Sequence, residues 1–319
     1  QADNIYRVAL ERSYPGRTTS YAIIPQSIGG AIKTEYPEVL ESTRLFNLGG
    51  NGNFFLRIGE KTFEEKRVLA ADSNFFRVFT CKVLHGDPVT ALEKTHSVVI
   101  NESTAKKYFG TTDVVGKQFE TDGDDTTETF AISAVVADWP GNSHFLFDML
   151  ISTNTFRFTR RPNFIGFAAH TYLLLNPNSS SQALEAKFPD IIKKYVSPEI
   201  NKVFDQSWED FQKAGNGYRY YLQPLTRIHL ISNLEAELRP NGSMTAVYIF
   251  GVVAVFILLL ACINFINLST ARSVERAKEV GIRKTFGSEK KSLIGQFLIE
   301  SVFVSVISML IAFGIIILH

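Results

Sequence analysis

Residues 244–268 read MTAVYIFGVVAVFILLLACINFINL, a stretch without a charged side chain that runs directly into the basic segment ARSVERAKEVGIRK at 271–284. As a helix, the 25 residues from Met244 to Leu268 would be about 37 Å long, and a hydrocarbon core of about 30 Å needs about 20 residues. Helices buried inside soluble proteins rarely run so long without a charge. The sequence therefore predicts a transmembrane helix at 244–268.

A second apolar stretch follows at Leu293–Leu318 and contains one charge, Glu300. A carboxylate at the bilayer centre would cost about 2–3 kcal/mol. Because Glu300 lies about two turns from the start of the stretch, we interpret it as an interfacial or partner-facing residue in preference to a functional intramembrane acid. The sequence predicts a second transmembrane helix at 293–318.

The distribution of charge predicts the orientation of the chain. The whole chain carries a net charge of only +1, which does not suggest nucleic-acid binding, but residues 272–300 hold seven Lys or Arg against four Glu. Basic loops between membrane spans favour the cytoplasm. We therefore expect 269–292 to be cytoplasmic and 1–243 to lie outside the cytoplasmic membrane. Since the chain starts at Gln1 and stops after an apolar run, we also expect a piece of a longer protein with an earlier span.

The basic segment has the pattern of a helix. Val274, Ala277, Val280 and Phe286 recur at a regular spacing within residues that form helices well. A solvated linker that only satisfies the charge rule would not need this spacing. We interpret the segment as a surface helix that docks a cytoplasmic partner.

Residues 1–243 alternate strand and helix patterns. The alternation at 5–10 is typical of a strand, the spacing at 25–39 of a helix, and Asn101 can cap a helix that Gly110 ends. Pro189 should interrupt a helix at 180–195. The order is strand–helix–strand early and late, with a β-rich block between. This order predicts an α+β domain in which a β-rich lobe, roughly 60–140, is inserted into an outer β-α-β layer.

The sequence argues against an enzyme. It contains no Gly-x-x-x-x-Gly-Lys-Ser/Thr loop for phosphates and no Gly-x-Ser-x-Gly nucleophile motif. The six histidines lack metal-ligand spacing, and Asp122, Asp124 and Asp125 are better explained as a solvated turn than as a calcium loop. Cys81 and Cys262 form no disulfide framework. We expect no cofactor, no metal and no catalytic residue.

Several motifs resemble those of one family. ACINFINLSTARSVERAKEVGIRK at 261–284 and QFLIE at 296–300 resemble the MacB/FtsX-type permeases of bacterial ABC transporters, and RAKEVGIRKTFG at 276–287 is similar to that family's cytoplasmic loop signature. The N-terminal part resembles the family's periplasmic core domain at ADSNFFRVF (71–79), LHGD (84–87), SVVINESTAKKYFG (97–110), VGK (115–117) and DWPGNSH (138–144).

The resemblance implies a first span, a periplasmic domain with a porter-like part and a smaller inserted lobe, and three further spans. By this resemblance 244–268 is span two and 293–318 is span three, so span one, span four and any second half of the protein lie outside this sequence. The loop between them, 269–292, would carry a coupling helix that contacts a separate ATP-binding subunit. The residues expected at this contact are Arg272, Glu275, Arg276, Lys278, Glu279, Val280, Gly281, Arg283, Lys284, Phe286 and Gly287.

The resemblance further implies a function. We expect a multi-pass permease of the bacterial inner membrane that couples ATP hydrolysis in its partner to movements of the periplasmic domain, and so exports or extracts periplasmic or membrane cargo. The implied partners are the ATP-binding subunit, a second permease copy or half, the lipid bilayer, and a periplasmic adaptor or hydrolase. One alternative is an FtsX-like regulator that transmits ATPase motion to cell-wall hydrolases. A sensor receptor fits less well, because the chain turns back after the first span.

Overall fold

The computed structural model describes all residues except 1, 50–53, 123–126, 288–289 and 319. The chain forms two units, Gln1–Met244, which we call the N-terminal domain, and Thr245–His319, which we call the helical unit. Asp124 and Asp125 of the expected acidic turn lie outside the described residues.

Fourteen strands occur within the described residues. They are β1 (Ile5–Tyr14), β2 (Arg17–Tyr21), β3 (Ile24–Pro25), β4 (Val39–Asn47), β5 (Phe54–Ile58), β6 (Lys61–Glu65), β7 (Val68–Ala71), β8 (Val83–Gly86), β9 (Ser97–Asn101), β10 (Gln118–Asp122), β11 (Thr127–Val136), β12 (Met149–Ser152), β13 (Phe167–Leu175) and β14 (Gly217–Pro224).

Helices connect and cover these strands. They are η1 (Ala2–Asn4), α1 (Ile28–Glu35), α2 (Phe75–Val78), α3 (Glu102–Phe109), η2 (Thr153–Thr155), η3 (Arg157–Arg160), α4 (Ser181–Glu185), α5 (Phe188–Ile191), the π-helix η4 (Ile192–Val196), α6 (Ser197–Phe204), α7 (Trp208–Lys213), α8 (Leu225–Ile231), α9 (Met244–Thr285) and α10 (Lys290–Leu318).

The strands of the N-terminal domain form one mixed sheet in the order β14-β1-β13-β4-β7-β12-β9-β11-β10-β5-β6, with β2, β3 and β8 paired to its members. Pairs β7–β12 and β9–β11 are parallel and the other strand pairs are antiparallel. This arrangement, followed by apolar helices, confirms the predicted α+β class. The ladder is continuous through β4, β7 and β12, so the division into a layer and an inserted lobe at 60–140 stays a prediction.

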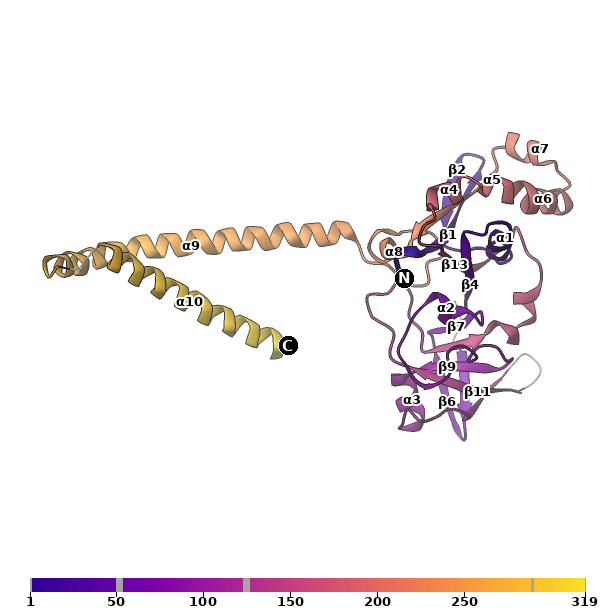
Figure 1. Ribbon diagram of the computed structural model, residues 1–319, viewed down its shortest axis with the longest axis horizontal. Coiled ribbons are helices and arrows are strands. Elements are labelled where there is room, and N and C mark those ends of the chain that lie inside the picture. The colour runs from indigo at the N-terminus through magenta and orange to yellow at the C-terminus, as the bar shows by residue number, and fades with distance from the viewer. Residues whose placement is uncertain (1, 50–53, 123–126, 288–289, 319) are drawn as a thin grey trace. The chain divides into compact units, whose positions relative to one another are not determined.

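The first and last strands of the N-terminal domain are neighbours. β1 pairs with β14 from Tyr6↔Pro224 to Ser13↔Gly217, and the N-terminus lies beside α8 (Figure 1). Residues from the two ends of the domain's sequence therefore share one part of the sheet.

Two buried clusters illustrate how the domain is stabilised. In one, Val8 of β1 and Ile28 of α1 pack with Phe188 of α5, all at most 1% exposed. In the other, Phe75 of α2 packs against Phe79, with ring centroids 5.0 Å apart. Fully burying one such side chain stabilises a fold by about 1.5–3 kcal/mol, so these clusters fix the helices against the sheet.

Local signals predicted helix ends well where the partners lie close in sequence. The Asn101 side chain accepts a hydrogen bond from the Thr104 amide at 2.8 Å, and Gly110 ends α3 with φ 71°. At the predicted helix 25–39, the helix covers only Ile28–Glu35. Tyr36 is extended because it precedes Pro37, whose ring disfavours helical backbone at the residue before it.

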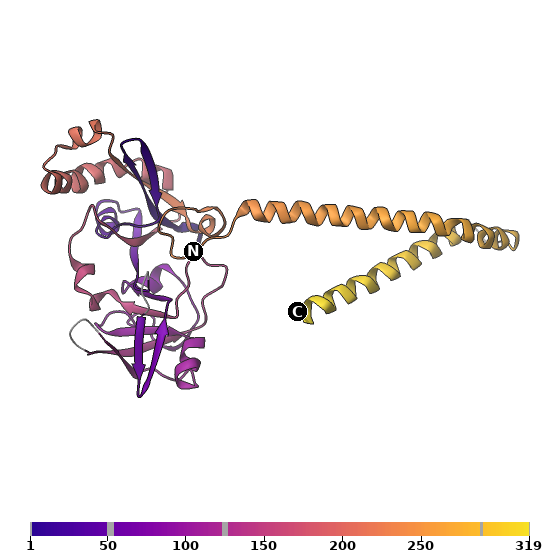
Figure 2. The same ribbon diagram turned by 180° about the vertical axis from the view of Figure 1, so that it is seen from behind.

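The helical unit begins as one long helix. α9 spans 42 residues without a break, about 63 Å, and Figure 2 shows it as a single helix. The candidate membrane-spanning segments are Met244–Ser273 in α9 and Ile294–Ile317 in α10, and none of their most apolar windows is buried by the protein. The predicted transmembrane segment 244–268 and most of the predicted loop 269–292 therefore belong to one continuous helix.

Candidate functional site

The basic end of α9 terminates in a defined turn. Arg283 and Lys284 lie in its last turn, where cations interact favourably with the negative end of the helix dipole. The Phe286 amide donates to the Ile282 carbonyl at 3.3 Å, and the Gly287 amide donates to the Lys284 carbonyl at 3.2 Å. Gly287 has φ 89°, a left-handed conformation that suits glycine and ends the helix.

Phe286 is the outstanding side chain of this turn, because 86% of its surface is exposed. Beside it, Arg283 Nη1 donates to Gln296 Oε1 at 2.8 Å and so connects α9 to α10. An exposed aromatic ring next to cations is a composition typical of interface centres. The turn thus presents one apolar anchor within a positively charged surface.

The structure brings the predicted contact residues together along the end of one helix and its following turn. Arg272, Lys278, Gly281, Lys284, Phe286 and Gly287 are exposed, and Val280 and Arg283 are half-buried. Glu275, Arg276 and Glu279 lie on the same helix, but their side chains lie outside the described part of the structure. Contact between this surface and an ATP-binding subunit stays a prediction.

Residues 232–242, which we call the connector, lead from α8 to α9 and are held to the domain by a buried charge pair. Arg7 of β1 has no exposed side-chain surface, and its Nη1 and Nη2 donate to the two Glu237 carboxylate oxygens at 2.5 and 2.8 Å. Arg7 Nη2 also donates to Ser232 Oγ at 2.8 Å and to Gln223 Oε1 at 2.6 Å. The guanidinium of Arg7 on β1 therefore bonds both to β14, through Gln223, and to the connector, through Ser232 and Glu237.

Further hydrogen bonds attach the connector at other points. The Ala22 amide donates to the Glu235 carbonyl, and the Glu235 amide to the Ser20 carbonyl, both at 2.9 Å. Arg239 Nη1 donates to the Gly141 carbonyl at 3.1 Å. The connector is thus bound to β1, to the chain around β2, and to the loop before His144, and it is not a free linker.

The charges around Arg7 are compatible with one another. Burial raises the pKa of Glu237, but the hydrogen bond and positive charge of Arg7 and the bond from Ser232 outweigh it and hold the pKa below its usual value. Burial and the charge of Arg7 lower the pKa of His144 to about 3. At neutral pH the group is therefore an ion pair beside a neutral imidazole, whose Nε2 lies 2.8 Å from the Tyr172 hydroxyl.

Sequence reasoning missed the connector. The available signal was Arg7 itself, a cation on the same face of a strand as Ile5 and Ala9. Its partner Glu237 is 230 residues away, so no spacing rule could have paired them.

Within the described residues, no group of three or more His, Cys, Asp or Glu side chains could hold a metal ion. The sequence contains no phosphate-binding P-loop. The features of the described residues on which a functional argument can rest are the basic turn, the long helix α9 and the anchored connector.

A large mixed-sheet domain that continues into exposed apolar helices defines a membrane protein with a substantial domain outside the bilayer. Family models match accordingly, the MacB-like periplasmic core domain over residues 1–191 and the FtsX-like permease C-terminal domain over 251–318. The chain belongs to the MacB/FtsX-type family of ABC transporter permeases.

Individual relatives agree with this family. An uncharacterised ABC transporter permease, YknZ of Bacillus subtilis strain 168, is 36% identical over 87 residues, which make up 27% of this chain and 22% of YknZ. The chain thus matches about a fifth of that protein's length.

Solved structures are similar to the N-terminal part of the chain as well. A crystallised domain of a protein from Porphyromonas gingivalis assigned as a permease aligns with TM-score 0.59 and 26% identity over 70% of this chain and 90% of that domain. The periplasmic region of MacB from Actinobacillus actinomycetemcomitans aligns with TM-score 0.44 and 13% identity, over 71% of this chain and 91% of that region.

Proposed function

We propose that this chain is a permease subunit that couples ATP hydrolysis in a separate cytoplasmic subunit to movements of its own periplasmic domain. The basic turn at the end of α9 docks on the ATP-binding subunit, with Phe286 as the apolar anchor. The N-terminal domain lies in the periplasm and acts on periplasmic or membrane-extracted cargo. Two permease copies or halves assemble in the inner membrane, and a periplasmic adaptor or hydrolase meets the N-terminal domain.

The observation that carries the proposal is the unbroken backbone of α9, which leads from the connector to the basic turn. One end continues the connector, which Arg7 and Glu237 fix to β1. The other end is the basic turn, capped at Gly287. α9 contains Gly251 and Gly281 but no proline, and it remains one α-helix over its 42 residues. An unbroken helix resists sharp bending, so a displacement at the basic turn would be carried along the helix axis.

The topology is tested by site-directed labelling. In a background with Cys81→Ser and Cys262→Ser, single cysteines replace the exposed Lys61 and Lys284, and intact cells are treated with a membrane-impermeant maleimide. We expect labelling at position 61 without permeabilisation and at position 284 only after it. Labelling of both positions from the same side would refute the proposed transmission.

Coupling is tested with the full chain in lipid nanodiscs together with the ATP-binding subunit that co-purifies with it. Phe286→Ala should weaken binding of that subunit about thirtyfold or more, since truncating an anchor of this kind costs about 2 kcal/mol or more of binding free energy. The control is Phe256→Ala, which changes an exposed ring in the apolar part of α9. Equal affinity for both variants, or recovery of no ATP-binding subunit, would contradict the proposal.

A further inference from the structure

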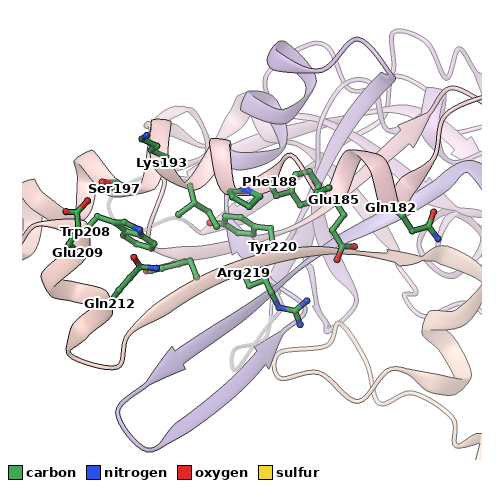
Figure 3. A pocket seen from close by; sticks show the side chains of 14 residues that line it. Gln182, Glu185, Phe188, Lys193, Ser197, Trp208, Glu209, Gln212, Arg219 and Tyr220 are labelled. Atoms are coloured by element: carbon green, nitrogen blue, oxygen red, sulfur yellow. The ribbon is translucent and has the colours of Figure 1, made fainter.

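The N-terminal domain contains an open, mainly apolar cavity that the coupling function does not use. Its volume is about 870 Å³, and its wall is formed by α4–α7, η4 and β14. Figure 3 shows the Tyr220 ring between Phe188 and Trp208, with Lys193 and Glu209 toward one end and Arg219 and Glu185 toward the other. Cavities of roughly 300–1,000 Å³ with a mainly apolar lining are the usual sites for small organic ligands.

The wall of this cavity contains a polar group without a partner. The Tyr220 side chain is 1% exposed, and its hydroxyl has no hydrogen-bond partner. An unsatisfied buried hydroxyl costs about 1–3 kcal/mol. Tyr220 lines the cavity while its hydroxyl is covered by neighbouring side chains, so a ligand that displaces this cover and reaches the hydroxyl would remove the penalty.

The charged side chains that line the cavity do not favour a ligand of either charge. Arg219 is paired with Glu11 at 2.8 Å, and a Glu185 carboxylate oxygen accepts from the Leu222 amide at 3.0 Å. Lys193 and Glu209, one of each sign, make no ion pair with the described residues. Because these two charges are opposite, this end of the cavity favours neither an anionic nor a cationic ligand. The apolar wall and the Tyr220 hydroxyl therefore decide which class of ligand fits.

We propose that this cavity binds a small, largely apolar molecule whose one hydrogen-bonding group meets the Tyr220 hydroxyl. A concave, mainly apolar wall suits a compact molecule, whereas a protein partner would need a larger and flatter surface. The site stands independently of the ATPase coupling, since every residue that forms it lies in the N-terminal domain.

The chain offers its own reporter for this site. It has two tryptophans, Trp139 and Trp208, and Trp208 lines the cavity. With Trp139→Phe, all tryptophan fluorescence comes from Trp208. The probe is 11-bromo-1-undecanol, which has an apolar chain, one hydroxyl and a bromine that quenches tryptophan on contact, and it is titrated onto the full chain in lipid nanodiscs. We expect saturable quenching.

Matched variants separate cavity binding from probe dissolved in lipid. Ala186 is exposed and lines the cavity, whereas Ala183, also exposed on α4, does not. Ala186→Phe should raise the apparent Kd at least tenfold, and Ala183→Phe should leave it unchanged. Non-saturable quenching, or the same Kd for both variants, would overturn the site, because lipid-dissolved probe quenches both alike.

Tyr220→Phe tests the polar contact. It should raise the Kd about fivefold, the effect of one ordinary hydrogen bond, while the unliganded domain keeps or gains stability because an unsatisfied hydroxyl is removed. A purely structural Tyr220 would show the opposite, lost stability with an unchanged Kd. Urea unfolding measures the stability of the variant, and titration of the same sample with the probe measures the Kd. Neither measurement depends on ATPase activity.

Discussion

Glu237→Gln should destabilise the N-terminal domain strongly, because it leaves a buried guanidinium without its counter-charge. Arg7 is 0% and Glu237 10% exposed in their side chains, and two hydrogen bonds of 2.5 and 2.8 Å join them. Removing one partner of a buried pair costs about 3–5 kcal/mol. Since glutamine keeps one acceptor oxygen, we expect the lower end, about 3 kcal/mol.

The assay is urea unfolding of the full chain followed by tryptophan fluorescence. Both tryptophans, Trp139 and Trp208, lie in the N-terminal domain, so the helical unit is silent. Glu11→Gln is the matched control, because its bidentate pair with Arg219 is largely exposed. An exposed pair contributes about 0.2–1 kcal/mol.

A double variant separates charge from packing. Arg7→Met with Glu237→Leu replaces the pair by apolar side chains and should recover most of the loss, as apolar replacements of buried pairs often do. If Glu237→Gln costs no more than Glu11→Gln, the connector is not held by the buried charge, and the reasoning about its attachment fails.

Three further predictions concern the same domain. Asn101→Ala should cost about 1–2 kcal/mol, because the side chain caps α3 and also donates to the Phe147 carbonyl at 3.0 Å. Gly86→Ala should lower the free energy of unfolding by at least about 3 kcal/mol, because Gly86 has a positive φ and a Cβ there would lie 2.4 Å from a carbonyl oxygen. Gly59 also has a positive φ, but a Cβ there would meet no atom within 4 Å, so Gly59→Ala should lower it by about 1 kcal/mol. Acidification from pH 7 to 5 should cost about 2 kcal/mol for each of the buried His144 and His170.

The sign of the pH effect follows from the folded pKa values of about 3, which burial holds below the usual 6.5 for His144 and His170. The unfolded chain binds protons first, so stability is complete above about pH 6.5 and falls as the pH drops below it. Urea midpoints measured from pH 8 to 5 check this, and a flat profile would contradict it. Equal losses for the two glycine variants, or an unaffected Asn101→Ala protein, would contradict the other two predictions.

Features set by neighbouring residues could be predicted from the sequence. The α3 cap and its end at Gly110 depend on atoms a few residues apart, so composition and order were sufficient. The same holds for the apolar stretch at 244–268 and for the helical pattern of the basic segment. Pro189 was expected to interrupt a helix, and it lies in the first turn of α5, where its missing amide is harmless.

Features set by chain topology could not be predicted. The pairing of β1 with β13 and β14 decides which strand face is buried, and only this pairing explains how Arg7 meets Glu237. The Tyr220 cavity likewise depends on how α4–α7 and η4, which all lie between β13 and β14 in the sequence, pack against β14. The basic segment at the end of α9 could be delimited from its sequence, and its contact with a partner stays a prediction. The attachment of the connector, in contrast, depends on contacts between distant parts of the chain.

Because β1 and β14 are neighbours, the sequence between them could be exchanged as one unit. The two ends of the strand ladder lie at one place, since β1 and β14 are paired along eight registered positions and η1 contacts α8. A recombination event that exchanges the segment between these strands therefore needs to rejoin the backbone at a single locality. Such a swap would give the same membrane apparatus a different exterior without redesign of its helices.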